Sequence, residues 1–332
     1  MLQSSVVPLI CFPGSVGSFE QELAECVFKT CSQLAANPVR LADASELLDF
    51  LRLNHQAQTV FLLFTTIVNS DLIAMVKIYK KRMRLALVLV PDSQVSPEIK
   101  SNTKLFESMI NVSPGVSVDR YFVPAIKKSV EFDFFGIEKY LRPGIPVYLH
   151  SLSRSFQKDS VIEELVNFVT HLEGIPPQRA SEFARRAGEV LDEFLMNAIW
   201  DANPQKFHKE RASPIFLKTS ELVEVAWTAF EQTLVLAVVD LFGSLDKETM
   251  LKYFESLQNP EPSSVGGLGG QITLNQQGPS GGIGIHLVLR RCEALVVNLH
   301  LGQKTEFLAF FNLSVSPASH SKLRRSLHVF CV

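Results

Sequence analysis

The chain has 332 residues, of which 46% are hydrophobic and 20% charged, and its net charge is −2. A chain of this length and composition can bury a large core and predicts two domains of ordinary size. A nearly neutral chain gives no reason to expect nucleic acid or an anionic membrane as the main partner.

The cysteines and the apolar segments indicate a cytoplasmic protein. The five cysteines are odd in number and loosely spaced, which favours reduced, buried thiols over a disulfide framework. The chain starts without the basic segment that begins a signal peptide. The longest apolar runs, such as residues 59–68, are too short to span a membrane.

Residues 1–135 alternate short apolar runs with helical patterns. The capping pair Ser18 and Gln21 marks the start of the first helix. Apolar strands that alternate with amphipathic helices indicate a parallel sheet covered on both faces, and hence a doubly wound α/β domain. Strands are predicted at 6–12, 38–43, 59–65 and 84–91, and helices at 18–35, 44–54 and 70–81.

A second domain is predicted after residues 136–147, a linker in which two prolines and a glycine break regular structure. Helices among mostly antiparallel strands indicate an α+β layer over residues 148–315, and residues 316–332 are expected to form a polar tail, either disordered or used for docking. Strands are predicted at 146–152, 221–230, 233–242, 294–301 and 305–313, and helices at 159–173, 177–201, 246–257 and 285–293.

The helix at 177–201 carries a carboxylate and an amide on one apolar face. Glu193 and Asn197 are four residues apart, so their side chains lie about one turn from each other. A carboxylate there can polarise a water, and an amide oxygen can hold Mg²⁺. The simpler alternative is that both side chains only reach solvent.

Three further features follow in the second domain. Asp240 ends a very apolar strand and needs a donor, such as the exocyclic amine of adenine, unless it simply caps the next turn. Thr305 opens the last strand, where its hydroxyl could face a phosphate. A glycine-rich segment at 263–284 could close over a ligand or be only a flexible loop. Its end could bind an anion at the start of a helix through Gly281, Gly282 and Gly284.

In this order the four features resemble the GHKL superfamily, the ATP-binding domain of histidine kinases, gyrase, heat-shock-90 chaperones and anti-sigma-factor serine kinases. "EFLMNA" at 193–198 resembles the N box, "VVDLFGSLD" at 238–246 the first glycine box and "GGIGIHLVLRRC" at 281–292 the second. "GQKTEF" at 302–307 is similar to the closing Gly–Thr segment. The resemblance covers residues 148–315 and implies a helix-over-sheet sandwich that binds Mg·ATP.

The resemblance also implies roles for single residues. Glu193 would be the general base, Asn197 the magnesium ligand and Asp240 the reader of adenine. Thr305 would support the adenine or phosphate side, and the glycines Gly281, Gly282 and Gly284 would lie by the phosphates. Phe242 stands where the first glycine box normally has glycine, and Gly243 follows it.

The compact arrangement is most similar to the bacterial anti-sigma-factor serine-kinase branch. The resemblance therefore implies a signalling protein that phosphorylates Ser or Thr of an antagonist protein, or that sequesters a sigma-like regulator. A histidine kinase fits poorly, because Ser follows His150 and Leu follows His171, where a phosphoacceptor His is usually followed by Glu or Asp. A non-catalytic module that uses ATP as a structural ligand is the alternative.

The first domain resembles a response-regulator receiver in the order of its elements but lacks the residues of receiver chemistry. Thr65 and Thr66 stand where an acceptor Asp would be, and Val123 precedes Pro124 where such domains usually carry Lys. Without carboxylates we expect neither a Mg²⁺ site nor an aspartyl phosphate. The resemblance implies a pseudo-receiver that serves partner binding or homodimerisation.

Overall fold

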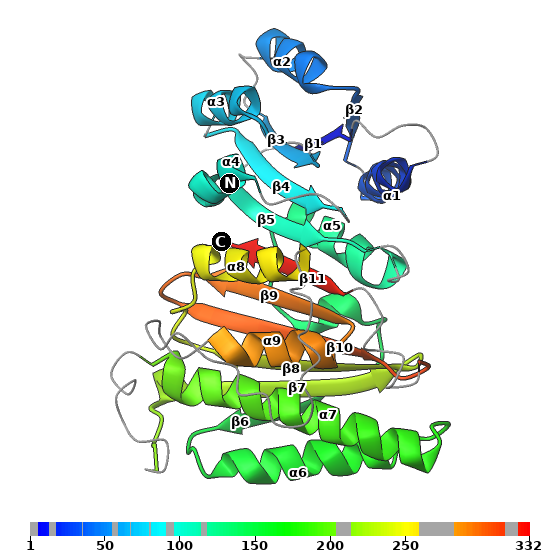
Figure 1. Cartoon of the computed structure of the whole chain (residues 1–332), viewed down its shortest axis with the longest axis vertical. Helices are drawn as coiled ribbons and strands as arrows, with labels where there is room; N and C mark the ends of the chain where they lie inside the picture. Colours follow the sequence, from blue (N-terminus) through cyan, green and yellow to red (C-terminus); the bar gives the residue numbers. More distant parts are fainter. Residues whose placement is uncertain are drawn as a thin grey trace, which may run out of the picture.

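Eleven strands of the described chain form one mixed sheet, in the order β2-β1-β3-β4-β5-β11-β9-β10-β8-β7-β6 (Figure 1). The structure is a computed structural model that describes residues 6–12, 18–34, 36–54, 59–66, 68–79, 81–90, 96–113, 118–203, 214–258, 282–315 and 325–332. The predicted mixed α/β class is confirmed, but the strands of its two parts belong to a single sheet.

The first part of the sheet is parallel. Its strands are β1 (Val6–Cys11), β2 (Val39–Leu41), β3 (Val60–Thr65), β4 (Met83–Leu89) and β5 (Phe106–Asn111). The helices are α1 (Phe19–Gln33), α2 (Ala44–Leu53), α3 (Ser70–Ile78), α4 (Pro97–Ser101) and α5 (Val123–Glu131). Successive residues of β1 alternate between two cores, because side chains of a strand point to opposite faces: Leu9 packs with α2–α4, and Ile10 packs with α1 and α5. Ser18 accepts the N–H of Gln21 at 3.3 Å, which confirms the predicted cap.

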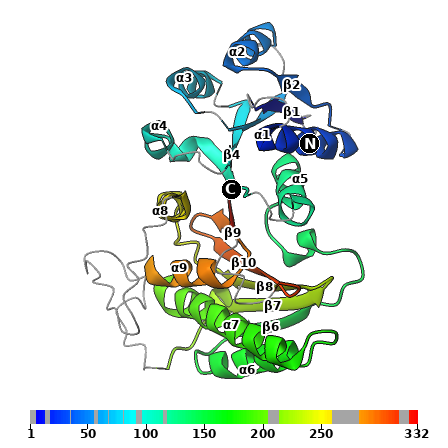
Figure 2. The same ribbon diagram turned by 45° about the vertical axis from the view of Figure 1, so that its right-hand side comes forward.

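The second part is antiparallel between neighbouring strands. Its strands are β6 (Tyr148–Leu152), β7 (Val223–Phe230), β8 (Thr233–Asp240), β9 (Ala294–His300) and β10 (Lys304–Asn312). The helices are α6 (Gln157–Thr170), α7 (Pro177–Met196), α8 (Lys247–Gln258) and α9 (Gly282–Arg291). Figure 2 shows α6, α7 and α9 gathered over one face of these strands. The β7–β8 hairpin turns at Glu231 and Gln232, whose φ values of 44° and 61° give the left-handed backbone of a two-residue hairpin.

The C-terminal segment corrects the prediction of a tail at 316–332. Residues Ser326–Cys331 form β11, which lies between β5 and β9, antiparallel to the first and parallel to the second. Leu327 and Phe330 are fully buried on opposite faces of the sheet. The strand was missed because it is short and follows a basic segment. It covers the edges that β5 and β9 would otherwise expose.

One other expectation changes. The segment expected to be a linker includes a short 3-10 helix, η3 (Ile137–Tyr140), and both of its end residues are buried against the sheet. Val123 and Pro124, which stand where a receiver usually carries Lys, begin α5.

α8 lies next to β11 and is hydrogen-bonded to β5 and to the segment before it. Lys247 Nζ donates to the carbonyl oxygen of Phe106 in β5, and Thr103 Oγ1 donates to Glu248 Oε1 at 3.5 Å. None of the helices in the described ranges is both long and apolar enough to cross a membrane.

Candidate functional site

Two predicted site residues, Glu193 of α7 and Gly284 of α9, lie against each other. A Cβ built on Gly284 would lie 1.5 Å from Glu193 Oε1 and 2.0 Å from its carboxyl carbon. The Glu193 carboxylate therefore occupies the space directly above the backbone of the first turn of α9. Only glycine permits this approach, because any side chain at 284 would displace the carboxylate.

Tyr253 and His286 complete this group, and neither was assigned a role by the sequence. Burial, and after it the charge of Glu193, raises the pKa of Tyr253 to about 12. The Tyr253 ring lies 5.0 Å from the His286 ring, edge to face. Burial and the charge of Arg290 lower the pKa of His286, although its side chain is exposed. Tyr253 comes from α8, a helix whose buried face gives no sign of a site in the sequence.

Asp240 and Thr305 form a second group at the adjoining ends of β8 and β10. They are directly opposite each other in the antiparallel register and are 3% and 1% exposed. Asp240 Oδ1 accepts the N–H groups of Phe242 at 2.9 Å and Gly243 at 3.1 Å. Burial raises the pKa of Asp240 to about 6, while these N–H groups and the Thr305 hydroxyl favour the ionised form. One oxygen of Asp240 thus caps its own turn, which was the simpler alternative for this residue.

Gly243 has a structural reason for being glycine. Its φ is +58°, and a Cβ there would lie 2.4 Å from the carbonyl oxygen of His300 and 2.7 Å from the amide nitrogen of Lys304. Its carbonyl oxygen accepts the N–H of Gly302 at 2.9 Å. The glycine is therefore required one position after Phe242, where the chain packs on the β9–β10 turn.

The two groups lie over the same face of the sheet. Phe194, next to Glu193, stacks on Phe307 with ring centroids 5.1 Å apart. Phe307 is two residues after Thr305 in β10, so both side chains point to the α7 side. Hence α7 carries Glu193 directly above the strands that hold Asp240 and Thr305.

The remaining predicted residues flank these groups. Asn197 is the C-cap of α7 and begins a π-helical turn, η4 (Asn197–Asp201). Its carbonyl oxygen accepts the N–H of Ala202 at 2.7 Å. Gly282 is the first residue of α9, and Gly281 lies outside the described residues. In the described part of the chain, no three or more His, Cys, Asp or Glu side chains gather as a metal site.

The first turn of α9 contains Gly282 and Gly284, so its backbone can be approached closely, and the approaching group here is the Glu193 carboxylate. The amide of Asn197 is a ligand type that Mg²⁺ accepts. The buried, partly capped carboxylate of Asp240 can accept a further donor. No protein-family model matches the sequence, and no curated protein is significantly similar to it.

Proposed function

We propose that this protein binds Mg·ATP between α7, α9 and the adjoining ends of β8 and β10, and that it acts as a bacterial signalling protein of the serine/threonine kinase or anti-sigma type. The observation that carries the proposal is the Glu193 carboxylate lying on the backbone of Gly284. It puts a base beside the first turn of a helix, the end at which the helix dipole favours phosphate.

Each residue has a distinct task in this proposal. The ionised Asp240 carboxylate accepts a hydrogen bond from the exocyclic amine of adenine. The N-terminal turn of α9 holds the phosphates. Asn197 would hold Mg²⁺, and the ion would supply positive charge beside the phosphates. Glu193 takes the proton of the attacking hydroxyl as that oxygen bonds to the γ-phosphorus and the bond to ADP breaks.

The order β2-β1-β3-β4-β5, with helices on both faces, supports a receiver-like first domain, and the helices over β6–β10 support the sandwich of a GHKL domain. The first domain lacks carboxylates where β3 ends, at Thr65 and Thr66. In the proposal it therefore binds a protein partner or a second copy and is not itself phosphorylated.

A non-catalytic ATP-binding module is the second candidate. It is favoured by Asp240 Oδ1, which already holds two backbone N–H groups of its own turn. In that case nucleotide would set the conformation of the site and control partner binding without phosphoryl transfer.

Titration of the full chain with ATP, with and without Mg²⁺, tests the binding site. Asn197→Ala should weaken Mg²⁺-dependent binding by about tenfold or more and leave Mg²⁺-free binding unchanged. Asn167→Ala, at an exposed position of α6, is the matched control. Equal Mg·ATP affinity of Asn197→Ala and the unchanged protein would refute the assignment.

Phosphoryl transfer separates the two candidates. Glu193→Gln should bind Mg·ATP but lose transfer to Ser or Thr of a partner protein, whereas Glu163→Gln, exposed on α6, should keep it. A protein that binds Mg·ATP well and shows no transfer or hydrolysis would be the non-catalytic module.

A further inference from the structure

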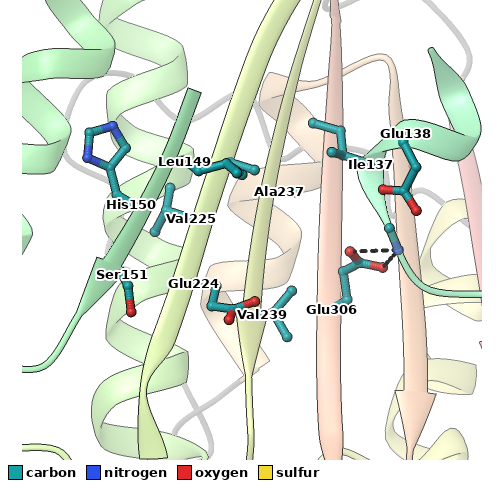
Figure 3. A pocket seen from close by; sticks show the side chains of 12 residues that line it. Ile137, Glu138, Leu149, His150, Ser151, Glu224, Val225, Ala237, Val239 and Glu306 are labelled. Carbon is teal, nitrogen blue, oxygen red and sulfur yellow. Dashed lines mark hydrogen bonds between the residues drawn. The ribbon is translucent and has the colours of Figure 1, made fainter. Parts of the chain in front are cut away.

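A pocket of about 360 Å³ lies on the free face of the antiparallel strands, opposite the helix-covered face. Figure 3 shows it between β6, β7, β8 and β10 on one side and the segment of η3 on the other. Its lining residues are Gly136, Ile137, Glu138, Leu149, His150, Ser151, Glu224, Val225, Ala226, Ala237, Val239 and Glu306. No residue of the proposed ATP site is among them.

Two alanines form the floor of the pocket, which is apolar and recessed because their side chains are short. Ala226 and Ala237 are directly opposite each other on β7 and β8, and Leu149 of β6 is opposite Ala226. Their short side chains leave a hollow between taller neighbours. Leu149 is 74% exposed, so one wall of this hollow is an apolar side chain facing solvent.

The rest of the pocket is acidic. Glu224 of β7 and Glu306 of β10 both lie opposite Val239 of β8, one on each side of it. Glu138 of η3 supplies a third carboxylate, and no Lys or Arg is among the lining residues. An amphipathic hollow lined by three carboxylates and by no Lys or Arg side chain is complementary to a cation with an apolar body.

Two of these carboxylates converge on one residue. The N–H of Gly136 donates to both oxygens of Glu306, at 3.1 Å and 3.0 Å. The Glu138 carboxylate lies against the same glycine, because a Cβ there would be 2.0 Å from Glu138 Oε1. Burial raises the pKa of Glu306, and repulsion from Glu138 adds to this rise. A bound cation would relieve the repulsion.

Two lysines lie near these carboxylates without being among the residues that line the pocket. Lys139 Nζ is 3.8 Å from Glu138 Oε1 but pairs more closely with Asp133. Buried Lys128 is linked to Glu306 through Asn298: its Nζ donates to Asn298 Oδ1 at 2.8 Å, and Asn298 Nδ2 donates to Glu306 Oε2 at 2.6 Å. Burial raises the pKa of Glu306 by more than the charge of Lys128 lowers it. Among the described residues, no ion pair joins a Lys or Arg side chain to Glu224 or Glu306.

We propose that this pocket is a binding site for a small organic cation, with an apolar body that covers Ala226 and Ala237 and an amine or guanidinium group between Glu224, Glu306 and Glu138. The volume lies within the range of about 300–1,000 Å³ for small-molecule sites. An apolar floor suits an organic ammonium better than a hydrated metal ion, which needs several oxygen ligands. The site is independent of ATP binding.

Calorimetric titration of the full chain with tryptamine tests the site, with indole-3-acetate as a probe of the same ring system but opposite charge. Tryptamine should bind at one site, more weakly at higher salt, and indole-3-acetate should not bind. Glu224→Gln should weaken tryptamine binding by about fivefold. Glu163→Gln, which removes an exposed carboxylate of α6, should leave it unchanged.

Ala226→Leu should abolish tryptamine binding, because the larger side chain fills the floor of the pocket. If Ala226→Leu fails to fold, Glu224→Gln provides the test, because Glu224 is exposed and its substitution should not disturb folding. Absence of tryptamine binding would overturn the proposal. So would equal affinity for the two probes, or tryptamine binding that Glu224→Gln leaves unaltered.

Discussion

The substitution Phe330→Ala tests whether the C-terminal residues form the strand that joins the two parts of the sheet. The Phe330 ring is fully buried, stacks on Phe134 with centroids 5.4 Å apart and lies 4.3 Å from Lys128 Nζ. Truncating a buried Phe to Ala costs about 3–5 kcal/mol. Loss of the contact with the Lys128 ammonium adds to this cost. The total is a large part of the roughly 5–15 kcal/mol that stabilises a typical protein.

Urea unfolding followed by circular dichroism measures this cost. The midpoint of Phe330→Ala should fall markedly while the slope of the transition stays the same. Val332→Ala is the control: Val332 is 62% exposed, and its substitution should change the free energy of unfolding by less than about 0.5 kcal/mol. If the two variants are equally stable, Phe330 is not buried between the two parts of the sheet.

Three other outcomes are expected. Gly284→Ala should weaken Mg·ATP binding by displacing the Glu193 carboxylate, whereas Gly302→Ala, with open space around its Cα but a φ of +73°, should lower only stability; equal nucleotide affinities would contradict this. Burial raises the pKa of Asp240 to about 6, so the folded state binds the extra proton, and stability should fall as the pH rises from about 4 to 6, by up to about 3 kcal/mol. Asp240→Asn should lack that part of the pH dependence in urea titrations at each pH. Burial raises the pKa of the Cys292 thiol to about 12, so an aromatic disulfide reagent should label it only on unfolding.

The strands that the sequence predicts are those with long apolar runs. β3 and β4 are fully apolar over most of their lengths and are evident from composition alone. β5 and β11 are not evident from composition. Ser108 and Asn111 interrupt the apolar run of β5, and His328 interrupts that of β11. These three polar side chains are buried only through contacts with distant parts of the chain. Period and composition cannot show which strand fills the gap between two distant edges.

The site divides in a similar way. Helical spacing alone brings Glu193 and Asn197 to neighbouring positions of α7. The approach of Glu193 to Gly284 depends on how α7 packs against α9, which no local pattern specifies. No local pattern specifies the place of Tyr253 either. The same holds for the turn that requires glycine at 243 instead of 242, because the contacts that require it come from the β9–β10 hairpin.

α8 links the parallel strands to the residues around Glu193. In its first turn, Lys247 donates to the carbonyl oxygen of Phe106 in β5, and Glu248 accepts from Thr103, which lies just before β5. Less than two turns later comes Tyr253, whose ring lies 5.0 Å from the His286 ring of α9 and whose pKa is raised in part by the charge of Glu193. The position of Tyr253 therefore depends on how α8 packs on segments that are far from it in the sequence, which is why no local pattern indicates this part of the site.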